Sequence, residues 1–218
     1  MFFHTYVATC FDVALCFMRD IIIFDLGGVL IQWDPRHVYR KLFADSAEIE
    51  WFLSNVCTSA WNATMDAGRP FAEGVAALQA EWPQYHDAIA AYHTRWVEMV
   101  PGDLPETVAV FRTLQAQQVP LYALTNWSAE TLPLVWDRFP FLNEFKGMVV
   151  SGKEGVIKPD PPIYHILMER YSIDPQRAIF IDDSLPNIET ARRLGIHGIH
   201  FTGAPALREA LQACGYTV

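Results

Sequence analysis

Polar side chains that could carry chemistry follow directly after short apolar runs of the sequence. They are Asp25, the pair Thr125 and Asn126, Lys158, and the pair Asp182 and Asp183. The carboxyl ends of parallel strands meet at one edge of a sheet, where open α/β proteins bind their ligands. Three carboxylates that converge there need a cation or strongly raised pKa values. The pattern predicts one site, although each residue alone is also typical of a helix cap or a solvated loop.

The element expected to position Asp25 is a strand over residues 21–24. These are four consecutive apolar side chains, three of them β-branched, which predicts burial on both faces. Gly27 and Gly28 then allow the backbone to turn tightly and to approach a ligand closely. An aspartate before paired glycines is also common turn chemistry. The other polar groups at the same predicted edge favour a functional role for Asp25.

The rest of the chain alternates between predicted strands and predicted helices. Further strands are expected at residues 119–124, 145–150, 178–181 and 198–201. Helices are expected between and after them, including one from residue 128 to about 138 and a last one over 204–214. This alternation implies right-handed crossovers and a three-layer α/β sandwich around a parallel sheet.

Residues 34–100 show helical periodicity and no strand pattern, with apolar positions three or four residues apart over 71–82 and 85–96. We therefore expect an all-helical domain at 34–100, inserted into a core formed by 18–33 and 101–218. Residues 1–17 form an apolar extension without a basic residue, interpreted as an upstream start-codon choice or a packed accessory segment.

The composition narrows the class of partner. A formal net charge of -9 argues against a nucleic-acid or anionic-membrane surface. A small anionic substrate stays possible, because a lysine and a metal ion in a pocket override the net field. The four cysteines show no zinc-type spacing, which favours reduced thiols in a cytoplasmic protein. The oligomeric state is left open between a monomer and a homodimer.

Four motifs in order resemble the haloacid dehalogenase superfamily. They are Phe24-Asp25-Leu26-Gly27-Gly28-Val29-Leu30, Leu124-Thr125-Asn126, Lys158-Pro159-Asp160-Pro161, and Phe180-Ile181-Asp182-Asp183-Ser184 followed by Asn187. The resemblance covers residues 19–215 and implies a three-layer Rossmann-like core with an inserted all-helical cap. Within the superfamily, the chain looks most like sugar-1-phosphate phosphatases and the N-terminal phosphatase domain of epoxide hydrolases.

The resemblance also implies roles for individual residues. Asp25 would attack the phosphorus of a small phosphorylated metabolite, such as a sugar phosphate, and form an aspartyl-phosphate. Lys158 would neutralise the nucleophile and the phosphoryl group, while Thr125 and the amide of Asn126 would hold phosphate oxygens. Mg²⁺ would be bound by Asp25, the carbonyl of Gly27, Asp183, and Asp182 directly or through water. Asn187 would support the acidic loop.

One position departs from the superfamily's phosphatase pattern. Gly27 stands where these enzymes generally place a second aspartate, which protonates the leaving group and later activates water. Such an acid/base group is typically worth about 10²–10⁴-fold in rate. Either the leaving group needs less help, or a cap residue or water replaces the aspartate. The cap candidates are Asp34, Asp66, His37 and Arg36, and the turn over residues 65–70 is where we expect substrate specificity.

Two other functions stay open. A metal-independent 2-haloacid dehalogenase would need no proton on its leaving group, but Asp182 and Asp183 favour a divalent cation. A catalytically weak binding or regulatory protein on the same fold would explain the missing acid, but it has no evident need for the whole set of site residues.

Overall fold

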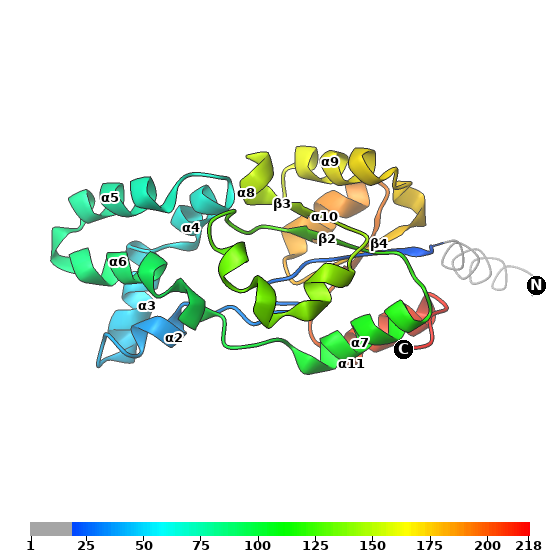
Figure 1. The fold of residues 1–218 in the computed structure, drawn as a ribbon, viewed down its shortest axis with the longest axis horizontal. Helices are drawn as coiled ribbons and strands as arrows, with labels where there is room; N and C mark the ends of the chain where they lie inside the picture. Colours follow the sequence, from blue (N-terminus) through cyan, green and yellow to red (C-terminus); the bar gives the residue numbers. More distant parts are fainter. Residues whose placement is uncertain (1–18) are drawn as a thin grey trace, which may run out of the picture.

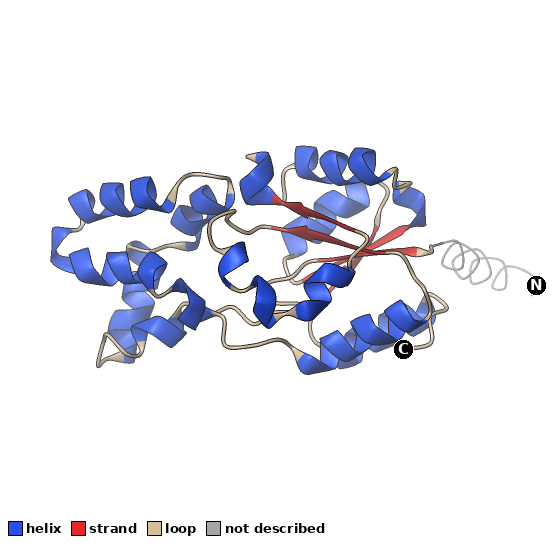
Figure 2. Ribbon diagram, in the orientation of Figure 1, coloured by secondary structure: helices blue, strands red, loops and turns tan. Residues whose placement is uncertain are grey.

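The computed structural model describes residues 19–218, and the predicted extension over residues 1–17 lies outside the described part. Its centre is a five-stranded sheet in the order β3-β2-β1-β4-β5, in which all neighbouring strands are parallel (Figures 1 and 2). The strands are β1 (Ile21–Phe24), β2 (Leu121–Thr125), β3 (Gly147–Val150), β4 (Ala178–Asp182) and β5 (His197–His200). The strand that precedes Asp25 therefore lies in the middle of the sheet, as its buried apolar sequence predicts.

Helices cover both faces of the sheet, which confirms the predicted three-layer α/β fold. Helices α7 (Pro105–Ala116) and α11 (Ala204–Ala213) lie on one face, and α9 (Pro161–Tyr171) and α10 (Leu185–Arg193) lie on the other (Figure 1). Phe24 packs on Phe111 of α7 with ring centroids 6.0 Å apart, and Phe180 packs on Tyr164 of α9 at 5.7 Å. Side chains that alternate along the strands are thus buried against opposite helical layers.

Residues between β1 and α7 form helices, with no strand among the described residues of this segment. The elements are α2 (Arg36–Tyr39), α3 (Ser46–Asn55), α4 (Ser59–Asp66), α5 (Phe71–Glu81), α6 (His86–Thr94) and the 3₁₀ turns η1 (Pro83–Tyr85) and η2 (Trp96–Met99). We refer to residues 34–100 as the helical insert. It lies beyond the carboxyl ends of the strands, towards which the arrowheads point (Figures 1 and 2).

Side-chain caps and contacts with the core fix the insert. Asp45 accepts a hydrogen bond from the amide of Ala47 at the start of α3, and Thr58 accepts one from Trp61 at the start of α4. The Ser151 hydroxyl donates to the carbonyl of Asp66 at 2.6 Å, so the last residue of α4 is tied directly to the core.

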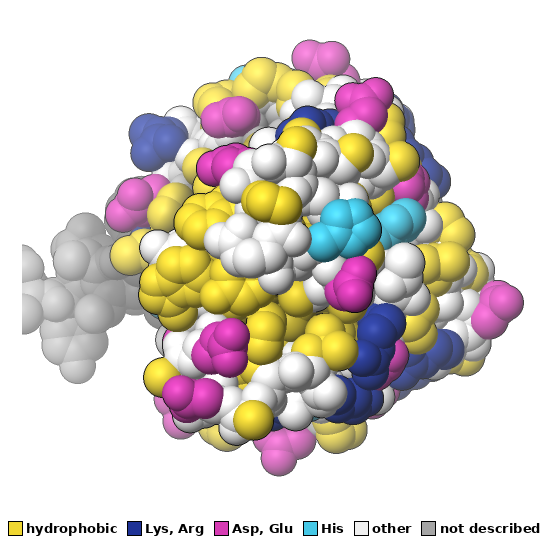
Figure 3. All heavy atoms as spheres, turned by 90° about the vertical axis from the view of Figure 1, so that its left-hand side faces the viewer, with side chains coloured by type: hydrophobic (Ala, Val, Ile, Leu, Met, Phe, Trp, Pro, Cys, Tyr) yellow, Lys and Arg dark blue, Asp and Glu magenta, His cyan; other side chains and the backbone are white. Residues whose placement is uncertain are grey.

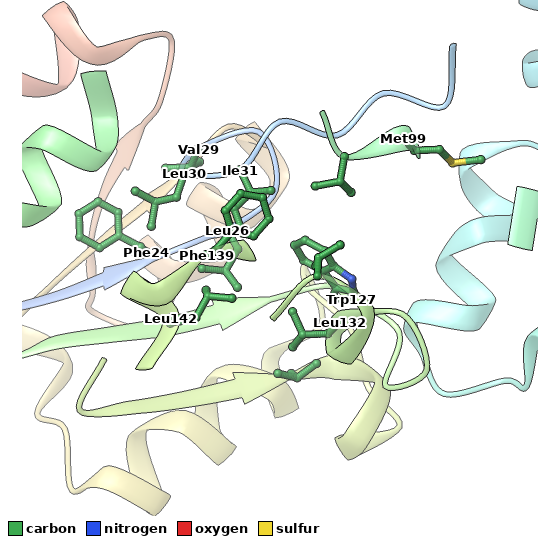
Figure 4. Close-up of a cluster of buried hydrophobic side chains, with 14 of the residues drawn as sticks. Phe24, Leu26, Val29, Leu30, Ile31, Met99, Trp127, Leu132, Phe139 and Leu142 are labelled. Carbon is green, nitrogen blue, oxygen red and sulfur yellow. The ribbon is translucent and has the colours of Figure 1, made fainter. Parts of the chain in front are cut away.

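The prediction of a helix from residue 128 to about 138 is wrong. This region instead contains η3 (Leu132–Leu134), η4 (Trp136–Arg138) and η5 (Pro140–Glu144). Pro133 and Pro140 lack the amide hydrogen that a continuous helix needs. The short turns bury Leu132, Phe139 and Leu142, which pack near Leu26 in a shared apolar cluster (Figure 4). The expected loop after β3 begins with the short helix α8 (Ser151–Glu154), and η6 (Pro175–Arg177) precedes β4.

The outer end of the insert carries hydrophobic side chains among charged ones (Figure 3). The large hydrophobic residues exposed in the insert include Leu42 and Trp51. No helix within residues 19–218 has the length and apolar character needed to cross a membrane. Cys57 is a free, buried thiol.

Candidate active site

The residues predicted from the strand ends meet at one edge of the sheet. Asp25 follows β1, Thr125 ends β2 and Asp182 ends β4. Carboxylate oxygens of Asp25, Asp182 and Asp183 lie within 4.8 Å of one another. These positions result from the parallel pairing of β1 with both β2 and β4, since neighbouring parallel strands end at the same edge.

Lys158 is the cation between two of these carboxylates. Its Nζ lies 2.9 Å from Oδ1 of Asp25 and 2.7 Å from Oδ2 of Asp182, and it donates to the carbonyl of Leu124 at 2.9 Å. Burial alone would lower the pKa of this ammonium group, but the two carboxylates outweigh burial and place it above its usual value. Lys158 is therefore positively charged where the nucleophile is expected.

The side chain of Asn126 holds the backbone of Lys158. Its Nδ2 donates to the carbonyl of Lys158 at 2.9 Å, and its Oδ1 accepts from the amide of Lys158 at 2.8 Å. This reciprocal pair joins the end of β2 to the segment before α9. The sequence places Asn126 beside Thr125, but its contact with a residue 32 positions away depends on the tertiary fold.

Asp182 is completely buried and fully engaged in hydrogen bonds. Its Oδ1 accepts from the amide of Ser184 at 2.8 Å and from Asn187 Nδ2 at 2.9 Å. Its Oδ2 accepts from Lys158 at 2.7 Å and from Asn187 Nδ2 at 3.0 Å. Each oxygen thus receives two donors, which matches its two lone pairs. Support of the acidic loop by Asn187 is confirmed, and the geometry makes Asp182 an anchor for Lys158.

Asp25 is buried, and its contacts with donors among the described residues are made by one carboxylate oxygen. Oδ1 accepts from the amide of Leu26 at 2.7 Å and contacts Lys158. Among the described residues, Oδ2 receives no hydrogen bond that competes for its lone pairs. Burial raises the pKa of Asp25, Lys158 opposes this, and the negative charges of Asp182 and Asp183 raise it further. A bound cation would therefore favour the ionised form of Asp25.

Asp183 is exposed and lies against the glycine turn after β1. Gly28 has a φ of +74°, and a Cβ on it would lie 2.9 Å from Cγ of Asp183. A glycine is thus needed both for the backbone conformation and for the close approach of this carboxylate. Partial desolvation of its carboxylate and the neighbouring charge of Asp182 raise the pKa of Asp183.

The donor chemistry of this edge fits a hard divalent cation. Such ions prefer carboxylate and carbonyl oxygens. Asp25 and Asp183 offer carboxylate oxygens there, and Gly27 and Gly28 line the same cavity. Asp182 belongs to the acidic group, but its oxygens already carry four hydrogen bonds.

Thr125 has the environment of an anion-binding hydroxyl. The residue is completely buried, and its Oγ1 has no hydrogen-bond partner within the described part of the chain. Leaving a buried polar atom unsatisfied typically costs about 1–3 kcal/mol. A ligand oxygen at this edge of the sheet would satisfy the hydroxyl group.

A cavity of about 230 Å³ lies between these residues and the helical insert. The core contributes Asp25, Gly27, Gly28, Asn126, Trp127 and Asp183, and the side of the insert contributes Trp33, Asn62, Asp66 and Trp96. Trp96 and Trp127 pack with ring centroids 5.5 Å apart. The sequence gives no reason to select Asn62, although it lies one helical turn before Asp66 and points from the same side of α4.

Comparison with known proteins agrees with this geometry. The family model for the haloacid dehalogenase-like hydrolases matches residues 19–195. A sesquiterpene phosphatase of Aspergillus oryzae is 25% identical over 192 residues, covering 88% of this chain and 94% of that protein. Acyl-CoA dehydrogenase family member 10 of Mus musculus is 30% identical over 200 residues, covering 82% of this chain but 17% of that longer protein.

A solved structure has the same fold. A variant of a haloacid dehalogenase family enzyme from Bacteroides thetaiotaomicron, in complex with magnesium and inorganic phosphate, superposes with a TM-score of 0.63 at 22% identity. The match covers 84% of this chain and 93% of that one. The match of the family model over most of the chain, together with the strand-end carboxylates and lysine, shows that this protein belongs to the haloacid dehalogenase-like hydrolases.

Proposed function

We propose that the protein is a Mg²⁺-dependent phosphomonoester hydrolase that acts through an aspartyl-phosphate on Asp25. The substrate class is a small phosphorylated metabolite, such as a sugar phosphate. The relative named as a phosphatase and the related structure with magnesium and phosphate support this reaction class. The size of the cavity, about 230 Å³, supports a compact substrate.

The observation that carries the proposal is the orientation of Asp25 against Lys158. The ammonium group contacts Oδ1 at 2.9 Å, so Oδ2 is the oxygen left to attack phosphorus. Lys158 is held by Leu124, Asp182 and the side chain of Asn126, so its charge is fixed before substrate binds. Fixed charge aimed at a phosphoryl group is an effective source of transition-state stabilisation.

The remaining residues have complementary roles in the proposed reaction. The hydroxyl of Thr125 and the amide of Asn126 would donate hydrogen bonds to phosphate oxygens. Mg²⁺, held by Asp25, the carbonyl of Gly27 and Asp183, would withdraw charge from the transferring group. Attack by Asp25 breaks the bond between phosphorus and the ester oxygen, and water then releases inorganic phosphate and regenerates the carboxylate.

The test is hydrolysis of p-nitrophenyl phosphate by the wild-type chain and by Asp25→Asn, each with Mg²⁺ and with a chelator. We expect Mg²⁺-dependent release of p-nitrophenol by the wild type alone. Equal release by the variant, or release that is insensitive to the chelator, would contradict the proposal. Chloride release from a 2-chloro acid in the presence of chelator would instead identify a haloacid dehalogenase.

A further inference from the structure

The missing acid at Gly27 leaves the proposed reaction without a proton donor for the leaving group. A replacement must reach the cavity that contains Asp25, and it must be able to hold a proton near neutral pH. Asp66, the last residue of α4, lines that cavity together with Asp25 and Gly27. Asp66 reaches the cavity from the helical insert, whereas Asp25 reaches it from the core.

The other sequence candidates do not meet these requirements. Asp34, Arg36 and His37 are not among the residues that line this cavity in the described chain. Asp34 accepts hydrogen bonds from the amide and from Nη1 of Arg36, at 2.9 and 3.2 Å. Arg36 also pairs with Glu50 at 2.6 Å, which raises its pKa and keeps it charged. A permanently charged guanidinium cannot serve as a proton donor in this pH range.

The surroundings of Asp66 suit a group that both gives and takes a proton. Burial raises its pKa to about 7, while a hydrogen bond from the backbone of Ser128 and the charge of Lys158 act in the opposite direction. Asn62 Nδ2 donates to Oδ2 at 2.8 Å. Tyr92, from α6, is the other titratable group that interacts with it, and burial raises the pKa of that phenol well above its usual value, so it stays neutral.

Contacts with the core also fix the position of Asp66. Its carbonyl accepts from the Ser151 hydroxyl at 2.6 Å, and the same hydroxyl accepts from the amide of Trp127 at 2.9 Å. Asn62 anchors the carboxyl group from within α4. The carboxyl group is therefore positioned over the cavity by both the insert and the core.

We infer that Asp66 is the general acid and base that replaces the aspartate missing at Gly27, an inference that rests on the proposed phosphatase function. As Asp25 Oδ2 bonds to phosphorus and the ester bond breaks, the Asp66 carboxylic acid transfers its proton to the departing oxygen. In the second step, the Asp66 carboxylate takes a proton from water as the water oxygen attacks phosphorus. Inorganic phosphate leaves, the Asp25 carboxylate returns, and Asp66 is protonated again.

The test compares esters whose leaving groups differ in their need for a proton. p-Nitrophenolate departs as a stable anion, phenolate less readily, and benzyl alkoxide only with protonation. We expect Asp66→Asn to lower kcat/KM for benzyl phosphate by about 10²–10⁴-fold and to affect p-nitrophenyl phosphate far less. The ratio kcat/KM reports the steps through transfer to Asp25, so slow release of phosphate does not obscure the comparison.

Asp34→Asn is the matched control, because it removes a nearby carboxylate that does not line the cavity. It should leave the dependence on leaving group unchanged. An equal loss on all three esters, or no loss on any, in an Asp66→Asn protein with the wild-type melting temperature would overturn the role of Asp66. Wild-type activity in Asp25→Asn would instead overturn the proposed function, so the two failures are distinguishable.

Discussion

The Nζ atom of Lys158 lies 2.9 Å from Oδ1 of Asp25, and both residues are buried. The ion pair fixes which oxygen of Asp25 is held and which is left to react. It also links β1 to the segment before α9, so one contact serves both the fold and the proposed chemistry.

We predict that Lys158→Met lowers both activity and stability. Loss of a fixed charge aimed at the phosphoryl group should reduce kcat by about 10²-fold or more. Because Asp25 and Asp182 would lose their buried partner, the free energy of unfolding should fall by about 3 kcal/mol. Steady-state kinetics and urea denaturation measure the two effects. Lys153→Met, which removes an exposed lysine of α8, should change neither quantity, and an equal loss there would contradict a specific role for Lys158.

Gly28→Ala should weaken the response to Mg²⁺. The new Cβ would lie 2.9 Å from Cγ of Asp183, so the carboxylate would have to move. The matched control is Gly155→Ala. Gly155 has a φ of +75°, close to the +74° of Gly28, but its Cβ would meet no described atom within 4 Å. Both variants should lose about 1–2 kcal/mol of stability from the left-handed backbone conformation.

Titration of activity with Mg²⁺ separates the two glycine variants. Gly28→Ala should need a higher Mg²⁺ concentration for half-maximal rate, whereas Gly155→Ala should keep the wild-type value. Equal Mg²⁺ dependence in both variants would show that Asp183 does not take part in binding the ion.

A site residue could be predicted from the sequence where its position follows from the end of a strand, but not where it depends on a contact between distant segments. Asp25, Thr125 and Asp182 could be predicted because each ends an apolar strand, and parallel strands end together. The reciprocal hydrogen bonds between Asn126 and Lys158 could not be predicted, because they join residues 32 positions apart. The sequence names Asp66 as one of four cap candidates, but its selection among them depends on how the helical insert docks against the core. The helix expected before residue 138 failed because Pro133 and Pro140 favour short turns.

The pH dependence of the reaction should differ between substrates. The pKa of Asp66 is raised to about 7, so its protonated fraction falls as the pH increases through that value. For benzyl phosphate, which needs the proton, kcat/KM should therefore decline above about pH 7. For p-nitrophenyl phosphate the decline should be smaller, since its leaving group departs without a proton. The ratio of the two values cancels ionisations common to both substrates. A ratio that stays constant over about two pH units on either side of that pKa would contradict proton donation by Asp66.

The last prediction concerns Gly27, where an acid can be restored. A Cβ at Gly27 would meet no described atom within 4 Å, and Gly27 is not among the glycines with positive φ. An aspartate there would have space and an ordinary backbone conformation. In the Asp66→Asn background, Gly27→Asp should therefore recover part of the rate on benzyl phosphate, while changing the rate on p-nitrophenyl phosphate little. Gly27→Asn in the same background is the control, because it adds the same bulk without an acidic proton. Recovery by Gly27→Asp alone would show that the two positions supply one proton to the same leaving group. Equal recovery by both variants would trace the defect of Asp66→Asn to packing in the cavity.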